Sequence, residues 1–158
     1  MRIGHVTPEA VYSVAINMRV RDREEFGAVA AFRTHGEMAL HLRDTFGRRH
    51  GFICVRADDD TPVCIGGAVQ HRPGVATLGF FATDRFPEVA VGVTRFVKRH
   101  YIPSQIATGV HRIECVSLAA YPEMHRWLET LGLSLEATFE AYGKDREDFV
   151  QYVQVMEG

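Results

Sequence analysis

Three side chains of the sequence are placed to take a proton from a substrate. Glu114 alternates with apolar neighbours in the strand expected at 113–118, so its carboxylate could face a cleft. His111 comes just before that strand, and Asp84 follows the strand expected at 75–82. Carboxylates and imidazoles act as general bases when the reacting proton lies within hydrogen-bond reach. Three structural alternatives stay open: a salt-bridged carboxylate for Glu114, an exposed imidazole for His111 and a capping carboxylate for Asp84.

Metal and nucleophilic chemistry find little support in the sequence. The histidines are not spaced three or four residues apart on an expected helix, and no cluster of His, Cys and carboxylate ligands occurs, so we expect no metal site. No Ser/His/Asp or Cys/His arrangement suggests a nucleophile. The three cysteines, Cys54, Cys64 and Cys115, lie scattered in apolar strand-like segments, so we expect buried, reduced thiols.

Length and composition indicate one soluble domain spanning residues 1–158. The 158 residues suffice for a single core and leave little room for a second. A net charge of −2 gives no sign of nucleic-acid binding. No apolar run reaches the roughly 20 residues that a bilayer span needs, and the first residues lack the apolar stretch of a signal peptide. We therefore expect a protein located inside a cell, or inside something assembled there.

Hydrophobic periodicity predicts the elements that position these side chains. Apolar residues recur at helical spacing in the first third of the chain, and the middle third reads as an antiparallel meander of strands. A helix, a strand, a helix and a closing hairpin follow. The expected helices begin at Pro8 (capped by Thr7), Asp22, about His35, Pro87 and Tyr121, the fourth ending near His100 and the fifth before Gly132; the expected strands cover 51–57, 63–69, 75–82, 113–118, 135–142 and 149–155.

This order of elements resembles the GNAT superfamily of N-acetyltransferases. The resemblance implies an α+β fold of the three-layer type, with a mixed, mostly antiparallel sheet of about six to seven strands flanked by helices. The helix ending in Leu131-Gly132 resembles the GNAT helix that ends in Leu-Gly-Phe. A closer resemblance is to the GNAT-like acetyltransferases and internal virion proteins of short-tailed bacteriophages. The motifs of that phage family occur in this sequence in the same order. They are Thr7-Pro8-Glu9, Met18-Arg19 with Asp22 and Glu25, Gly66-Gly67, Phe80 to Asp84, and Arg126-Trp127-Leu128.

The resemblance implies acetyl-CoA as the cofactor. Its diphosphate would lie on a loop that corresponds to residues 85–90, where Arg85 and Ala90 fit the family pattern. Glu88 replaces the first glycine of that pattern, and Pro87 removes one N–H donor. Backbone N–H groups further along the loop could still bind the anion. The implied cofactor residues are Phe81, Ala82 and Thr83 at the thioester, and Arg85, Val89, Ala90, Val91 and Gly92 at the diphosphate.

The catalytic residues of the family are only partly matched. The tyrosine that is the general acid in many GNAT enzymes corresponds to Leu128, and an asparagine earlier on that helix corresponds to Tyr121. Tyr121 could reach the mouth of the site or could pack against the sheet. The catalytic candidates are therefore Glu114, His111 and Tyr121.

Two functions remain open at this point. The first is an acetyl-CoA-dependent N-acetyltransferase with degenerate motifs, acting on an amine of a small molecule or a protein. The second is a non-catalytic phage protein, structural or accessory, that works within the virion or during DNA ejection. The corresponding partners are an amine acceptor or virion proteins, with a homodimer through the apolar strand at 149–153 as a further expectation. The corresponding locations are the cytoplasm of a bacterial host or the virion.

Overall fold

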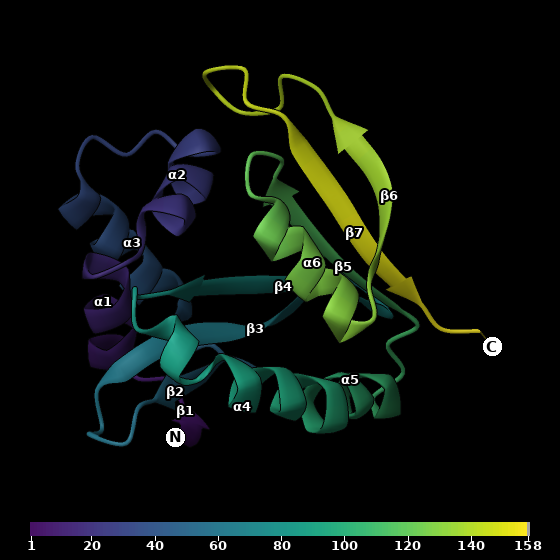
Figure 1. The fold of residues 1–158 in the computed structure, drawn as a ribbon, viewed down its shortest axis with the longest axis horizontal. Coiled ribbons are helices and arrows are strands. Elements are labelled where there is room, and N and C mark those ends of the chain that lie inside the picture. The colour runs from purple at the N-terminus through teal and green to yellow at the C-terminus, as the bar shows by residue number, and fades with distance from the viewer. Residues whose placement is uncertain (158) are drawn as a thin grey trace. The chain divides into compact units, whose positions relative to one another are not determined.

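The computed structural model describes residues 1–157, and most segments with a clear apolar period form the element predicted for them (Figure 1). Helix α1 begins as expected, with Thr7 Oγ1 accepting a hydrogen bond from the Ala10 amide at 3.1 Å and Pro8 in the first turn. The strands are β1 (Arg2–His5), β2 (Ile53–Arg56), β3 (Pro62–Arg72), β4 (Val75–Ala82), β5 (Arg112–Leu118), β6 (Ser134–Phe139) and β7 (Phe149–Val155). The helices are α1 (Pro8–Ile16), α2 (Val20–Ala28), α3 (His35–Phe46), η1 (Phe86–Glu88), α4 (Ala90–Phe96), η2 (Val97–Tyr101), α5 (Ile102–Ala107) and α6 (Pro122–Leu131).

The strands form a seven-stranded sheet in the order β1-β2-β3-β4-β5-β7-β6. Pairing is antiparallel between β1 and β2, β2 and β3, β5 and β7, and β6 and β7. Strands β4 and β5 are parallel, in a ladder that runs from Val75–Arg112 to Thr77–Glu114. A parallel pair needs a crossover connection, and the helices between β4 and β5 supply it. The predicted mixed, mostly antiparallel α+β fold is confirmed.

Strand β1 was not predicted from the sequence. Its residues pair with β2 from Arg2–Arg56 to His5–Ile53. The strand lies at the edge of the sheet, and three of its four residues are exposed. An exposed edge strand carries no alternation of apolar and polar residues, so the period that revealed the other strands is missing here.

The crossover helix continues beyond its predicted end at His100. It passes from the 3₁₀ turn η1 through α4 and the π-helical turn η2 into α5, which ends at Ala107. Pro103 explains the π turn, because proline has no N–H for the carbonyl four residues back and its ring crowds that carbonyl. One residue before the proline, the Ile102 amide bonds to the carbonyl of Val97, five residues back rather than the four of an α-helix. The helix therefore widens at this turn and continues.

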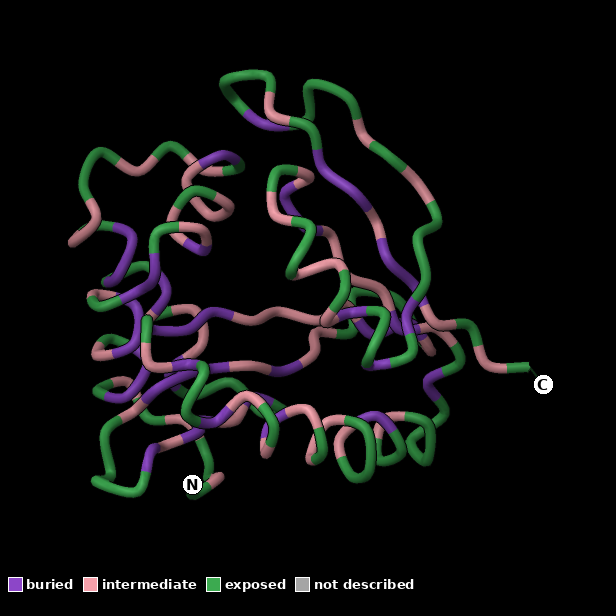
Figure 2. The backbone as a smooth tube through the Cα atoms, viewed as in Figure 1, coloured by how far each residue is buried: buried purple, intermediate pink, exposed green. Residues whose placement is uncertain are grey.

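The chain divides into two compact units, and β3 and β4 run through both. The first comprises residues 1–68 and 79–93, and the second comprises residues 69–78 and the chain from 94 onward. In the first unit, α1 and α3 lie side by side, and buried positions alternate with exposed ones along both helices (Figure 2). The largest fully buried side chains of this unit are Phe81, Ile65, Val11, Val14, Val55 and Val63. The prediction of a single domain stays a prediction.

The second unit contains β5, β7 and β6 with α6. Helix α6 begins after Tyr121 and contacts the strands through His125, whose Nε2 lies 3.1 Å from the carbonyl oxygen of Leu118. The indole N–H of Trp127 donates a hydrogen bond to Thr94 Oγ1 at 2.9 Å. Leu128 and Leu131 are buried on the inner face of the helix.

Gly132 ends α6 in the left-handed conformation, with φ at 102°. A Gly132→Ala variant should lose roughly 1–2 kcal/mol of unfolding free energy, because an L-residue is strained at this φ. Thermal unfolding should show the loss as a fall in Tm of about 2–8 °C. The matched control is Gly4→Ala, where the added methyl group meets open space and φ is not positive. Equal stabilities for the two variants would contradict the interpretation.

Candidate functional site

The chain leaves β4 through an ordered turn at Thr83. The Thr83 amide donates a hydrogen bond to the carbonyl of Val63 at 2.9 Å. The carbonyl of Thr83 then accepts the Phe86 amide at 3.1 Å, and its hydroxyl accepts the Arg85 amide at 3.3 Å. Strand β3 and the threonine side chain therefore fix the start of residues 83–92, which we call the 83–92 segment.

The end of the 83–92 segment is the start of α4. The carbonyl of Val89 accepts the amide of Val93 at 2.9 Å and so begins the helix. Amides in the first turn of a helix lack intrahelical partners and point along the axis, where they favour anions. The Val91 side chain is 72% exposed, and its neighbours Ala90 and Gly92 are half-buried. Gly92 lies against the thioether of Met1, whose methyl carbon would be 2.5 Å from a Cβ at position 92.

Arg85 is held by two carboxylates. Its Nε and Nη2 donate hydrogen bonds to the two oxygens of Glu88, both at 2.8 Å. Its Nη1 donates to Asp59 Oδ2 at 2.9 Å. Glu88 therefore makes a bidentate ion pair with Arg85 within the 83–92 segment. An anion that approaches Arg85 has to exchange with Glu88.

The protonation of these groups follows from the contacts. The hydrogen bond from the Thr61 amide, followed by that from Arg85, lowers the pKa of Asp59 to about 2. The hydrogen bonds from Arg85 lower the pKa of Glu88, and those to Glu88 and Asp59 raise the pKa of Arg85. All three groups are charged at neutral pH.

An NMR titration of the side-chain carboxyl groups should find a midpoint of about 2 for Asp59, against an ordinary value of 3.8. Because the folded pKa is the lower one, the stabilisation is present above the unfolded value and is lost as the pH falls through the folded value. In an Arg85→Gln variant the midpoint should move upward and remain below the ordinary value, because the Thr61 amide still donates. An unchanged midpoint in that variant would show that the Arg85 contact does not form in solution.

A small pocket lies beside this ion pair. Its volume is about 240 Å³. It is lined by Arg85, Glu88 and Val89 of the 83–92 segment, and by Met1 and residues 57–59. The pocket is therefore bordered by the carboxylates that hold Arg85.

The amides expected at the thioester already have partners. The Ala82 amide donates to Asp22 Oδ2 at 2.9 Å, and the Thr83 amide is bonded to Val63. Phe81 is buried, with 1% of its surface exposed. A substrate carbonyl would have to displace Asp22 or Val63 to use the amide of Ala82 or Thr83.

Glu114 lies within an ion-pair network on β5. Its Oε1 accepts from Arg72 Nη2 at 2.8 Å and from the Thr77 hydroxyl at 3.3 Å. Its Oε2 accepts from Arg112 Nε at 2.9 Å, and Arg112 also pairs with Glu136. Two guanidinium groups thus engage the carboxylate, and a general base in this position would have to release at least one of them.

The remaining proton-transfer candidates stand apart from that network. His111 is exposed and precedes β5, where its backbone bonds to Gly74 and Met156. Tyr121 is half-buried at the N-cap of α6, where its carbonyl accepts the amide of Met124 at 3.0 Å. Asp84 is exposed in the turn after β4.

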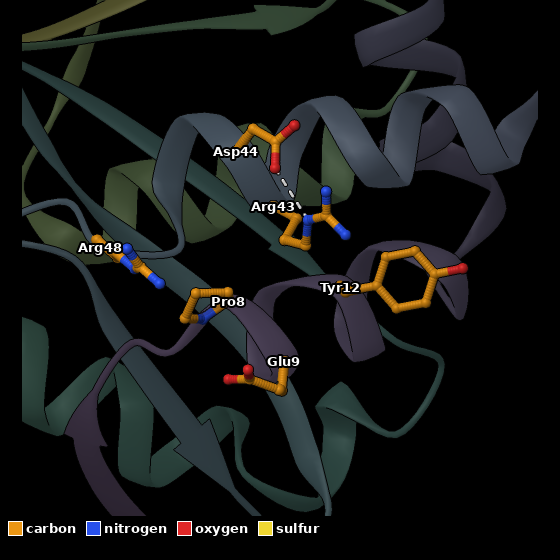
Figure 3. Close-up of a pocket in the computed structure, with 6 residues that line it drawn as sticks. All are labelled: Pro8, Glu9, Tyr12, Arg43, Asp44 and Arg48. Atoms are coloured by element: carbon orange, nitrogen blue, oxygen red, sulfur yellow. Dashed lines mark hydrogen bonds and ion pairs between the residues drawn. The ribbon is translucent and has the colours of Figure 1, made fainter.

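A larger pocket, of about 630 Å³, lies on α1 and the end of α3 (Figure 3). Its charges are mixed, and Arg43 Nε donates to Asp44 Oδ1 at 2.9 Å across one wall. None of its lining residues is among the predicted site residues. They are Pro8, Glu9, Tyr12, Arg43, Asp44 and Arg48.

Over residues 1–157, His, Cys, Asp and Glu side chains nowhere gather in a group of three or more that could hold a metal ion. Cys54 and Cys64 are buried, and their burial raises the pKa of both thiols. Cys115 is half-buried.

Among residues 1–157, no helix has the length and apolar character to cross a membrane.

Two contacts of the site could not be read from the sequence. Asp59 lies 26 residues before its partner Arg85 in the chain. Arg19 and Asp22 were noted as part of a motif, and the structure shows that Asp22 binds the end of β4. The motif gave no sign of this contact.

Neither a protein-family model nor a curated protein matches the sequence. Solved structures do resemble it. A phosphinothricin acetyltransferase from Sinorhizobium meliloti, solved in complex with AcCoA, matches with a TM-score of 0.70 and 16% identity over 99% of this chain and 89% of that one. An acetyltransferase of the GNAT family from Bacillus anthracis has a TM-score of 0.68 and 13% identity over 97% and 93%. A ribosomal-protein-alanine N-acetyltransferase from Brucella melitensis has a TM-score of 0.67 and 14% identity over 99% and 100%.

These likenesses show that the chain has the fold of GNAT acetyltransferases. They confirm the GNAT-like fold that we expected from the order of elements. Because a fold carries more than one function, the reaction has to be argued from the site.

Proposed function

We propose that the chain is an acetyl-CoA-dependent N-acetyltransferase. The observation that carries this proposal is the 83–92 segment, which joins an arginine to the start of a helix. In the same fold, the phosphinothricin acetyltransferase from Sinorhizobium meliloti was solved with AcCoA. N–H groups and a guanidinium are the donor set that a diphosphate needs, so the residues present fit acetyl-CoA.

The chain's own residues would divide the work as follows. The amides of Val91 and Gly92 would hold the diphosphate at the start of α4, and Arg85 would add charge after exchanging Glu88 for phosphate. When bound, acetyl-CoA supplies an activated acetyl group. For the acceptor amine, Glu114, His111 and Tyr121 remain the candidates that could take or return a proton.

The chemical class of the acceptor is an amine of a small molecule or of a protein. Structures of similar fold include a phosphinothricin acetyltransferase and a ribosomal-protein-alanine N-acetyltransferase. The experiment is a thiol-release assay with acetyl-CoA and two acceptor panels, small amines and peptide N-termini. Acetyl transfer to a defined amine by the purified protein supports the proposal. Release no faster than without protein, in both panels, would contradict it.

A second candidate is a non-catalytic role on the same scaffold, in a phage virion or during DNA ejection. The occupation of Arg85 by Glu88 favours it, because that carboxylate stands where the cofactor phosphate would bind. The phage-type motifs and a homodimer through β7 are further parts of this second proposal. Acetyl transfer at ordinary enzyme rates would rule it out.

A further inference from the structure

Arg19 and Asp22 form a buried ion pair at the junction of α1 and α2. Arg19 is the N-cap residue of α2, and Asp22 lies in its first turn. Arg19 is 5% exposed and Asp22 is 3% exposed. Arg19 Nε donates to Asp22 Oδ2 at 2.6 Å. Charged side chains are almost never this deeply buried unless they are paired.

The pair is attached to a single residue at the end of β4. Asp22 Oδ2 accepts the Ala82 amide at 2.9 Å, and the backbone amide of Arg19 donates to the Ala82 carbonyl at 2.9 Å. Met18 and Thr83 form an isolated antiparallel bridge next to it. Both polar groups of the last β4 residue are therefore bonded to the α1–α2 junction.

The arginine side chain also joins the two ends of the turn that follows β4. Its guanidinium carbon lies 5.5 Å from the ring centre of Phe80 and 5.1 Å from that of Phe86. The two rings contact each other edge to face, with centres 5.2 Å apart. Phe80 precedes the turn and Phe86 begins η1, so one planar cation spans the start of the 83–92 segment.

We propose that Arg19 and Asp22 are positioning residues that hold the end of β4 and thereby orient the 83–92 segment toward acetyl-CoA. The second half of this inference rests on the proposed function. The path is short: the pair fixes Ala82, Thr83 next to it supports the turn into η1, and η1 leads into α4. A helix start is oriented only as well as the turn that leads into it.

Stability alone gives little reason for such a pair. A buried ion pair is often no more stabilising than apolar side chains of the same volume, because both charges lose their hydration. The bonds from the Ala82 amide to Asp22 and from the Arg19 amide to the Ala82 carbonyl, in contrast, are directional and meet on one residue. Pre-organisation of a binding segment lowers the cost of ordering it when the ligand binds.

Two mild variants test the inference without emptying the core. Arg19→Lys keeps the charge and loses the planar group between Phe80 and Phe86. Asp22→Asn keeps an acceptor for the Ala82 amide and loses the negative charge. The matched control is Val14→Ala, which opens a cavity at a fully buried position of α1 and removes neither partner of Ala82. All proteins are compared at a temperature where each is folded, as judged by its unfolding curve.

Hydrogen exchange of the backbone amides is the first readout. In Arg19→Lys and Asp22→Asn, the amides of residues 82–92 should exchange about tenfold faster than in the natural chain, while those of α1 and α3 stay within about twofold. In Val14→Ala the increase should not be concentrated at residues 82–92. Equal exchange patterns in the variants and the control would overturn the positioning role.

The affinity for acetyl-CoA, measured by calorimetry, is the second readout. It should fall about tenfold in the two variants and stay within about twofold in Val14→Ala. An affinity that follows stability across all three proteins would overturn the link between the pair and the cofactor. If the natural chain itself binds no acetyl-CoA, the proposed function fails, and the exchange pattern still decides whether the pair holds the 83–92 segment.

Discussion

Replacing Arg19 with methionine lowers the free energy of unfolding at neutral pH by about 3–5 kcal/mol, because it leaves the carboxylate of Asp22 buried without its cation. The methionine keeps apolar contact with Phe80 and Phe86, so the loss reports mainly on the charge. For a chain of this length the loss corresponds to a fall in Tm of about 6–20 °C, which calorimetry can measure.

The loss in Arg19→Met also depends on pH in a defined direction. Burial raises the pKa of Asp22, and the hydrogen bond and charge of Arg19 oppose that rise. Without Arg19 the pKa of Asp22 rises further, so the folded variant takes up a proton at a higher pH than the natural chain does. A group with a raised folded pKa stabilises the fold below its unfolded pKa and loses that contribution as the pH rises. The stability difference should therefore be largest at neutral pH and shrink toward about pH 4.

The control for this prediction is Arg72→Met, which removes an exposed arginine that pairs with Glu114 at 2.8 Å. The Arg72 side chain is 61% exposed, so its removal should change the unfolding free energy by no more than about 1 kcal/mol. Equal losses for the two variants, or an Arg19→Met loss that grows on acidification, would contradict the role given to the buried pair.

Replacing Glu88 with glycine should tighten acetyl-CoA binding about 10- to 100-fold. The substitution removes a negative charge from the proposed diphosphate site and releases two hydrogen-bond donors of Arg85. A hydrogen bond to a charged group contributes about 1.5–3 kcal/mol, which sets the size of the effect. Calorimetric titration of the variant beside the natural chain measures it.

Two further variants separate the causes of that gain. Glu88→Gln keeps the length of the side chain and removes its charge, so it should recover most of the gain if charge dominates. Asp44→Asn removes an exposed carboxylate of α3 and should leave the affinity unchanged, although it alters the net charge equally. If the Glu88→Gly variant binds acetyl-CoA no more tightly than the natural chain does, Arg85 is not a phosphate ligand.

Most of the fold could be predicted from the sequence, because most elements have a clear apolar period. The cap at Thr7, the helix stop at Gly132 and the meander of β2 to β4 all have local signals, and the structure contains each of them. Strand β1 lacks such a signal because it is an exposed edge. The continuation of the crossover helix past Pro103 was hidden because a π turn compensates for the proline.

The site was less predictable, because its contacts join residues far apart in the chain. The sequence placed a negative charge at Glu88, but it could not show that Arg85 neutralises it with help from Asp59. It also marked Arg19 and Asp22 as members of a motif of the family resemblance, but not their bonds to Ala82, some sixty residues away. The roles of Glu114, His111 and Tyr121 in proton transfer stay predictions.

The most direct test of the acetyltransferase proposal is isothermal titration of acetyl-CoA into the purified, folded protein. We expect saturable binding at one site, with a dissociation constant in the micromolar range that reflects competition between phosphate and Glu88 for Arg85. No saturable heat at ligand concentrations up to about 1 mM, with the protein still folded, would contradict the proposal and leave the GNAT fold to serve a function without the cofactor.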